Sequence, residues 1–415
     1  MTLFPATADA NARRLVVARG LRAIADGYVS VLLPAWLLAL GLDAFEVGVL
    51  TAATLLGSAV LTLLVGFITA RFGHRRPLLA SAILMVATGL GFAALSDFWP
   101  LLVVAFVGTI NPSTGDVSVF LPLEQSLLAH SVGDRDRTAL FVRYAVAGYV
   151  MGAAGTLLAA VPDLAGQWAN VAPASAMQAM FVLYAALGAL SGLIYRAIDE
   201  PQASPETPPS APLGPSRSIV YRLAALFSID AFGSGLVVQS ILALWLFQAF
   251  GLSVATAASL FFWTNALSAV SLFAAAPIAR RIGLVNTMVF THLPSNLCLI
   301  AVPFTSNLTV VMALLLVRSL LSQMGVPTRN SYVMSVVTPA ERAAAASVTS
   351  VPRSLASGIG PLISGWLVML SGFGWPLLLA GLLKTGYDLA LLAMFRHVQP
   401  PEERAETDAR KFGGT

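Results

Sequence analysis

Three carboxylates stand inside long apolar segments of the chain. Asp26 and Asp230 lie near the middle of two such segments, and Asp116 lies in a third. A charged side chain at the centre of a bilayer costs at least about 2.5–3.5 kcal/mol, so a charge kept there is a candidate for function. A carboxylate in apolar surroundings also binds a proton more readily than one in water. We therefore predict that Asp230, Asp26 and Asp116 couple the chain to protons, with Asp230 first.

Other charges near these carboxylates leave structural alternatives open. Arg22 stands four residues before Asp26 on the same helical face, so the two could form a neutralised structural ion pair. Lys384 and Asp388 have the same spacing and are predicted to neutralise each other. The lone histidine of its segment, His292, is predicted to be structural, with a proton relay as the alternative.

Arginines in apolar segments indicate a competing chemistry. Arg318 lies near the middle of its segment, and Arg143 and Arg353 occupy matching places in theirs. A guanidinium group binds carboxylates and phosphates through two parallel hydrogen bonds, so these residues favour an anionic substrate. Alternatively, Arg143 and Arg353 extend to the membrane interface. Further substrate-binding candidates are the polar residues Gln239, Asn265 and Gln323.

The composition places these residues in membrane helices. The chain has 415 residues, of which 57% are hydrophobic and 11% charged, whereas a soluble domain carries roughly 25% charged residues. Apolar stretches of about 20 residues have the length of a helix that spans a bilayer. We predict twelve spans, near 15–40, 45–69, 77–95, 101–128, 139–160, 175–195, 219–249, 257–279, 287–304, 309–337, 346–370 and 375–396. Glu124 and Arg329 are expected near the ends of their spans.

The chain repeats itself at an offset of 210 residues. Gly73 falls on Gly283 at this offset, and Arg143 falls on Arg353. Two copies of a membrane unit are typical of secondary transporters. We predict a six-helix bundle over 1–198, a proline-rich linker over 199–218, a second bundle over 219–396 and a tail over 397–415.

The distribution of arginines predicts the orientation. The loops after even-numbered spans carry arginines, and those after odd-numbered spans carry none. By the positive-inside rule, both termini and the linker are cytoplasmic, and we place the chain in the inner membrane of a bacterium. Arginines confined to such loops form no continuous basic face, so we expect no nucleic-acid partner. The single cysteine excludes a disulfide within the chain.

One loop carries a recognisable motif. The residues from Gly66 through Arg71 and Gly73 to Arg75 resemble the loop 2–3 signature of the major facilitator superfamily, and Arg281 with Gly283 repeats it. The resemblance implies a helical membrane protein of two six-helix halves, and a gating role for both loops. The signature's usual acid is replaced by Ala70, so we expect a weaker cytoplasmic ion-pair latch, or one in which Arg71 and Arg75 use Glu124 or Asp134.

Small residues in spans 5 and 11 allow close helix approach. Gly148, Gly152 and Gly155 lie in span 5, and Gly358, Pro361 and Gly365 lie in span 11. They are similar to the antiporter signature of the superfamily, although the proline occurs only in the second copy; simple packing is the alternative.

These patterns predict a secondary transporter that works by alternating access, most simply proton-coupled export of a small organic compound or drug. The alternatives are an organic-anion transporter, or a membrane sensor of the same fold. Motifs of metalloproteases and serine hydrolases are missing from the sequence. We therefore expect no enzyme activity and no cofactor or metal. We expect a monomer whose partners are a small molecule, protons and the lipid bilayer.

Overall fold

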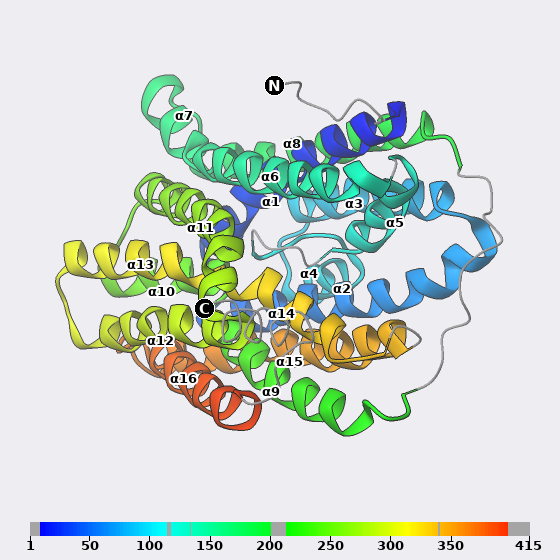
Figure 1. Ribbon diagram of the computed structural model, residues 1–415. Coiled ribbons are helices and arrows are strands. Elements are labelled where there is room, and N and C mark those ends of the chain that lie inside the picture. Colours follow the sequence, from blue (N-terminus) through cyan, green and yellow to red (C-terminus); the bar gives the residue numbers. More distant parts are fainter. Residues whose placement is uncertain (1–8, 114–117, 133, 201–212, 339–340, 397–415) are drawn as a thin grey trace. The chain divides into compact units, whose positions relative to one another are not determined.

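The computed structural model describes residues 9–113, 118–132, 134–200, 213–338 and 341–396, and this part of the chain is helical throughout its regular structure (Figure 1). The first helices are α1 (Ala10–Ala39), α2 (Ala44–Phe72), α3 (Arg75–Ala94), α4 (Phe98–Val107), α5 (Phe120–His130), α6 (Asp134–Leu158), α7 (Val161–Ala169) and α8 (Pro173–Arg196). The later ones are α9 (Arg217–Gly235), α10 (Gln239–Phe250), α11 (Val254–Ile282), α12 (Leu284–Ala301), η1 (Val302–Phe304), α13 (Leu308–Ser322), α14 (Gly325–Ser335), α15 (Arg342–Leu370) and α16 (Trp375–Phe395).

Every predicted span contains α-helix, and three of them contain two α-helices each. The break between α4 and α5 includes an Asn111 turn, in which Oδ1 accepts hydrogen bonds from the backbone N–H and the hydroxyl of Ser113. Such local bonds compete with the helical ladder. Breaks also separate α9 from α10 and α13 from α14. The predicted spans 219–249 and 309–337 each correspond to one apolar segment that could cross a membrane, over Arg217–Phe250 and Leu308–Ser335.

Length and composition make most of these helices suitable for crossing a membrane. In the described part of the chain, ten helical segments are long and apolar enough to do so. An α-helix satisfies its own backbone hydrogen bonds, which a lipid environment requires. The chain is an integral membrane protein.

The repeat is visible in the backbone. Gly73 follows α2 with φ 73° and ψ −170°, and Gly283 follows α11 with φ 86° and ψ 164°. Each glycine N–H bonds back to the fourth residue before it, at Thr69 and Ala279. This region of backbone angles is essentially restricted to glycine, so the 210-residue offset aligns residues of equal structural role.

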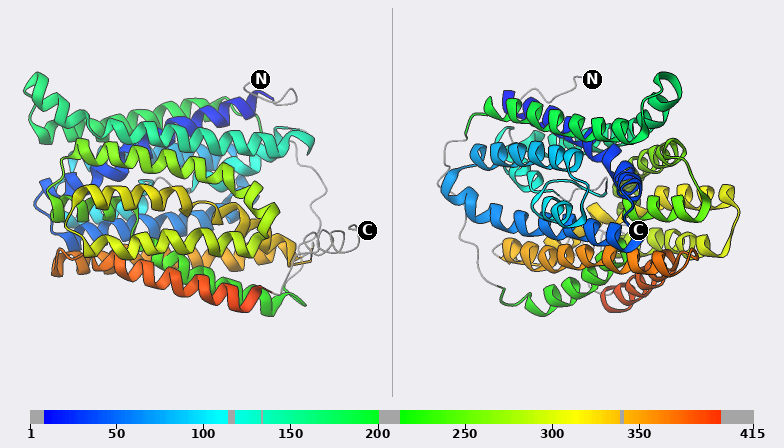
Figure 2. Two further views of the ribbon diagram at one scale, coloured as in Figure 1. Left: turned by 60° about the vertical axis from the view of Figure 1, so that its left-hand side comes forward. Right: turned by 180° about the vertical axis from the view of Figure 1, so that it is seen from behind.

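Contacts divide the chain into two compact units. Unit 1 comprises 1–203, 237–266 and 358–374, and unit 2 comprises 204–236, 267–357 and 375–415. In unit 1, α6 lies along α1 and α8 lies along α3 (Figure 1). In unit 2, α16 lies against both α12 and α9 (Figure 2).

Glycines let the backbones of unit 1 touch, as the sequence predicted. A Cβ on Gly155 of α6 would lie 2.3 Å from the carbonyl oxygen of Ile24 on α1. A Cβ on Gly365 would lie 2.7 Å from Cα of Gly48 on α2. Because real Cβ atoms do not approach so closely, these positions accept glycine alone without movement of a helix.

Candidate transport site: buried charges in each unit

Asp230 is buried in unit 2 between two cations. Its exposed fraction is 5%. Nζ of Lys384, on α16, lies 2.5 Å from Oδ1, and Nη1 of Arg329, on α14, lies 3.5 Å from Oδ2. Lys384 also donates a hydrogen bond to Oγ of Ser234, one turn after Asp230 on α9. Asp230 is thus held in place as the centre of a charged network.

This network corrects one expectation. Lys384 pairs with Asp230 across helices instead of with Asp388 on its own helix. Arg329, the second cation of the network, is enclosed by protein with an exposed fraction of 6%. The sequence missed both partners because they are 99 and 154 residues away from Asp230.

His292 and Asp388 form a second group in unit 2. Nδ1 of His292 lies 3.6 Å from Oδ1 of Asp388, and Nδ2 of Asn296 donates to Oδ2 of Asp388 at 2.8 Å. Asp388 is completely buried. His292, for which the sequence left a structural role and a proton relay open, therefore faces a carboxylate.

Unit 1 contains a comparable cluster, in which a buried carboxylate on α5 pairs with an arginine on α1. The guanidinium of Arg22, on α1, donates to Oε2 of Glu124, on α5. The hydroxyls of Tyr144 and Tyr195 donate to Glu124 at 2.5 and 2.6 Å. The ring of Phe120 lies 4.1 Å from the guanidinium carbon. Glu124 has an exposed fraction of 0%, so it is enclosed by protein.

Asp26, the other candidate on α1, is 8% exposed. It is one of several groups that act electrostatically on Arg22, which forms its ion pair with Glu124. The third predicted proton-coupling residue, Asp116, lies outside the described residues.

The predicted substrate-binding residues are divided between the units. Arg143, Gln239 and Asn265 belong to unit 1, and Arg318, Arg353 and Gln323 belong to unit 2. Arg143 has a buried guanidinium nitrogen without a hydrogen-bond partner, and so does Arg353. Of these residues, Arg353 acts electrostatically on Asp230.

The polar candidates have different surroundings. The side-chain amide of Gln239 donates to Oγ of Ser30 on α1 at 2.8 Å. Asn265 is buried within α11 with an exposed fraction of 8%. Gln323 follows α13 and is half-buried, and its backbone N–H donates to Oγ of Ser271.

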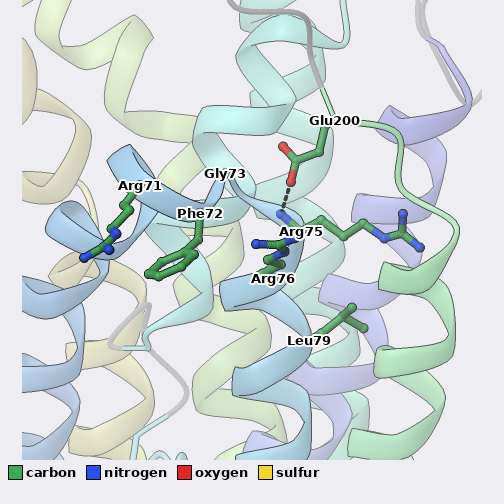
Figure 3. A pocket seen from close by; sticks show the side chains of 7 residues that line it. All are labelled: Arg71, Phe72, Gly73, Arg75, Arg76, Leu79 and Glu200. Carbon is green, nitrogen blue, oxygen red and sulfur yellow. Dashed lines mark hydrogen bonds between the residues drawn. The ribbon is translucent and has the colours of Figure 1, made fainter.

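The loop between α2 and α3 contains a pocket lined by Arg71, Phe72, Gly73, Arg75, Arg76, Leu79 and Glu200 (Figure 3). Glu200 follows α8, and its carboxylate accepts hydrogen bonds from the backbone N–H of His74 and Arg75 at 3.2 and 2.6 Å. The Arg75 side chain donates to the carbonyl oxygen of Arg196. A carboxylate is favourable at a helix N-terminus, where backbone N–H groups lack helical partners.

In this chain Ala70 stands where the motif usually has an acid. Glu200, which is distant in the sequence, brings a carboxylate to the same loop. Glu124, the expected partner of Arg71 and Arg75, is buried with Arg22 instead. The side chain of Asp134, the other expected partner, lies outside the described residues. In the matching loop of the repeat, Arg281 is exposed before Gly283. Gly66 lies within α2.

Long apolar helices that repeat along the chain, with ionisable side chains buried in each unit, define a class of protein that moves solutes across membranes. The model of the Major Facilitator Superfamily matches residues 15–305 and 223–414. The chain belongs to this superfamily, and its fold is the all-helical major facilitator fold of two repeated halves.

Individual relatives are distant. The uncharacterized membrane protein YJR124C of Saccharomyces cerevisiae is 24% identical over 410 residues, covering 90% of this chain and 92% of the relative. The uncharacterized MFS-type transporter YcaD of Escherichia coli is 27% identical over 135 residues, covering 32% of this chain and 34% of YcaD. That match thus spans about a third of YcaD.

Solved structures agree with the fold. The nucleoside transporter NupG superimposes with a TM-score of 0.71 at 13% identity, covering 94% of this chain and all of that one. A bacterial homolog of the human lysosomal transporter Spinster gives 0.70 at 15% identity, covering 92% and 95%. The human organic anion transporter MFSD10 gives 0.63 at 18% identity, covering 92% and 99%.

Proposed function

We propose that this membrane transporter exports a small organic compound in exchange for protons, working as a monomer by alternating access. The observation that supports it is the buried network in which Asp230 contacts Lys384 and Arg329. Placing charges inside the membrane is costly. A network in which two cations share one carboxylate can respond strongly to a single proton.

The chemistry follows from the contacts of Asp230. A proton on its carboxyl group removes the negative charge that holds Lys384 and Arg329. Lys384 keeps its contact with Oγ of Ser234 at 2.8 Å, but it loses its counter-ion. Protonation and substrate binding then act on the same helices, α9, α14 and α16. A solute that stabilises one arrangement of these helices shifts the proton equilibrium by linkage.

Export is the direction that we propose from the similarity of Gly148, Gly152 and Gly155 to the antiporter signature. The proposed orientation, with both termini on the cytoplasmic side of a bacterial inner membrane, rests on the arginine-rich loops. Contacts between α6 and α1 support the packing role of these glycines.

The test begins with a thermal-shift screen of the purified chain against organic anions, lipophilic cations, nucleosides and neutral drugs. A ligand at 100 times its dissociation constant adds about 2.7 kcal/mol of stability. The compound found is then loaded into proteoliposomes, and its flux is measured with and without a pH gradient. We expect uphill flux driven by protons, lost in Asp230→Asn while solute exchange per folded protein continues. Flux that ignores the pH gradient would refute proton coupling.

A second candidate function, transport of an organic anion, is favoured by the charge balance of unit 2. Lys384, Arg329 and Arg353 surround Asp230, and Asp388 is the second carboxylate of this group. Three basic side chains thus accompany two carboxylates, and Arg353 has a buried Nε without a hydrogen-bond partner. Stabilisation by anions alone in the thermal-shift screen would select this function over export of drugs.

A further inference from the structure

Two buried atoms of unit 2 face each other without a hydrogen bond. Nδ1 of His292 and Oδ1 of Asp388 are 3.6 Å apart, and each lacks a hydrogen-bond partner. His292 is 8% exposed and Asp388 is 0% exposed. A buried polar atom without a partner costs about 1–3 kcal/mol, so this pair needs an explanation.

The hydrogen-bond partners of the imidazole determine where its protons are. Nε2 of His292 lies 3.1 Å from the backbone carbonyl oxygen of Ser322. A carbonyl oxygen accepts and never donates, so Nε2 carries a hydrogen. In a neutral imidazole Nδ1 then has a lone pair and no hydrogen. An ionised Asp388 is likewise an acceptor, so two acceptors would face each other. One additional proton satisfies both atoms.

The surrounding helices hold the two side chains at this distance. Asn296 donates to the other carboxylate oxygen of Asp388 at 2.8 Å. A Cβ on Gly381 of α16 would lie 3.0 Å from the carbonyl oxygen of Asn296, so α12 and α16 are in close contact here. A Cβ on Gly325 of α14 would lie 2.4 Å from Nε2 of His292, so this glycine makes room for the ring.

Neighbouring cations are engaged elsewhere. Lys384, one turn before Asp388, donates to Asp230 and Ser234, and Arg329 pairs with Asp230. Other charged or titratable groups of this region are Arg353 on α15 and Tyr387 on α16. Asp388 therefore has His292 as its ion-pair partner. Whether the imidazole is protonated determines whether the negative charge of Asp388 is neutralised.

We propose that His292 and Asp388 form a proton-binding site that holds one exchangeable proton between Nδ1 and Oδ1. The proton binds to the pair from water and leaves to water, and no other bond changes. His292 acts electrostatically on Asp230, so loading of this site changes the charge near the Asp230 network. That this proton drives transport rests on the proposed function. That the pair binds a proton rests on the geometry of the two side chains alone.

The test uses the full-length chain in detergent without any solute. The histidines are labelled with ¹⁵N, and the His292 signals are identified by their loss in His292→Gln. Both ring nitrogens are followed from about pH 5 to 9, the range in which an imidazole titrates. We expect Nδ1 to show one proton-binding step. In Asp388→Asn its midpoint should fall by about one pH unit or more, a tenfold loss of proton affinity.

Asp97→Asn is the matched control, because Asp97 is exposed and its side chain makes no capping hydrogen bond at α4. In this variant the midpoint of proton binding at Nδ1 of His292 should equal that of the wild type. An equal midpoint in Asp388→Asn contradicts the proposal. So does a wild-type Nδ1 that stays unprotonated and unbonded throughout, an outcome that needs no folded variant. A titrating His292 combined with flux indifferent to pH would refute proton coupling but leave the site intact.

Discussion

Lys384 and Asp230 contact each other at 2.5 Å, although they lie 154 positions apart on α16 and α9. Their contact joins the first and the last helix of unit 2. A buried ion pair becomes costly when one partner is removed, since the other charge stays behind in a medium that cannot solvate it.

Asp230→Asn is therefore expected to destabilise the chain by about 3–5 kcal/mol, because Lys384 and Arg329 lose their shared carboxylate. Unfolding of the detergent-solubilised variant measures this loss. Adding Lys384→Met should restore part of the stability, since it removes one unpaired charge. If the single variant unfolds at the wild-type midpoint, the network does not stabilise the fold.

Glu124→Gln is expected to cost a similar ~3–5 kcal/mol, because it leaves Arg22 buried without a counter-ion. The control is the pair of Arg14 with Asp199, which are 3.3 Å apart with Asp199 86% exposed. Asp199→Asn should change stability by less than about 1 kcal/mol, as is usual for exposed pairs. Equal losses in the two variants would argue against a buried role for Glu124.

The carboxylate of Glu341 predicts a pH dependence outside the membrane-spanning helices. The hydroxyl of Thr338, the backbone N–H of Gly214 and the hydroxyl of Ser216 donate to it and lower the pKa of Glu341 from 4.5 to about 2. A carboxyl group whose pKa is lower in the folded than in the unfolded state stabilises the fold at pH values above its unfolded pKa. For Glu341 this contribution is lost as the pH falls from 4.5 toward 2.

The measurement is the unfolding midpoint of wild type and Glu341→Gln at several pH values. The difference between them should be largest above pH 4.5 and shrink toward pH 2. A difference independent of pH would show that the charge of Glu341 contributes nothing to stability.

Gly73→Ala and Gly283→Ala should each destabilise the chain by about 1–3 kcal/mol, because their backbone angles are essentially restricted to glycine. The alanine at 73 would also approach Oε1 of Glu200 to 2.8 Å. Gly372→Ala is the control, since nothing lies within 4 Å of a Cβ at that position. Thermal unfolding of the three variants should place Gly372→Ala nearest to the wild type.

Arg318→Lys tests the anion hypothesis. Arg318 is half-buried in α13, and in the described part of the chain it forms no ion pair. If the cargo is an anion bound by this guanidinium, the substitution removes the bidentate fork and weakens binding. Thermal shifts with a panel of organic anions report the affinity. An unchanged shift would remove Arg318 from the binding site.

Local patterns in the sequence were enough to predict much of the fold. Apolar stretches of span length predicted the helices, and the 210-residue offset predicted the paired glycines Gly73 and Gly283. These features depend on residues close in the chain or on backbone angles that one residue type allows. The helix breaks between α9 and α10 and between α13 and α14 were harder to predict, because the apolar run continues on both sides of each break.

The sequence did not allow most of the pairings between charged residues to be predicted. Lys384 and Asp388 have the spacing of a helical ion pair, but the packing of α16 against α9 gives Lys384 a closer carboxylate. Glu200 replaces the missing loop acid from a position 130 residues after Ala70. Pairings of this kind depend on tertiary contacts between helices, which a single sequence does not encode in any local pattern.

Each buried cluster joins an acid and a base on two helices of its unit. Glu124 is the fifth residue of α5, and Arg329 is the fifth residue of α14. Each pairs with the first long helix of its half, to Arg22 and Asp230 respectively. The acid lies on the later helix in the first pair and on the earlier helix in the second. A hybrid built from two copies of one half would therefore repeat one sign pattern, and two copies of the first would lack His292.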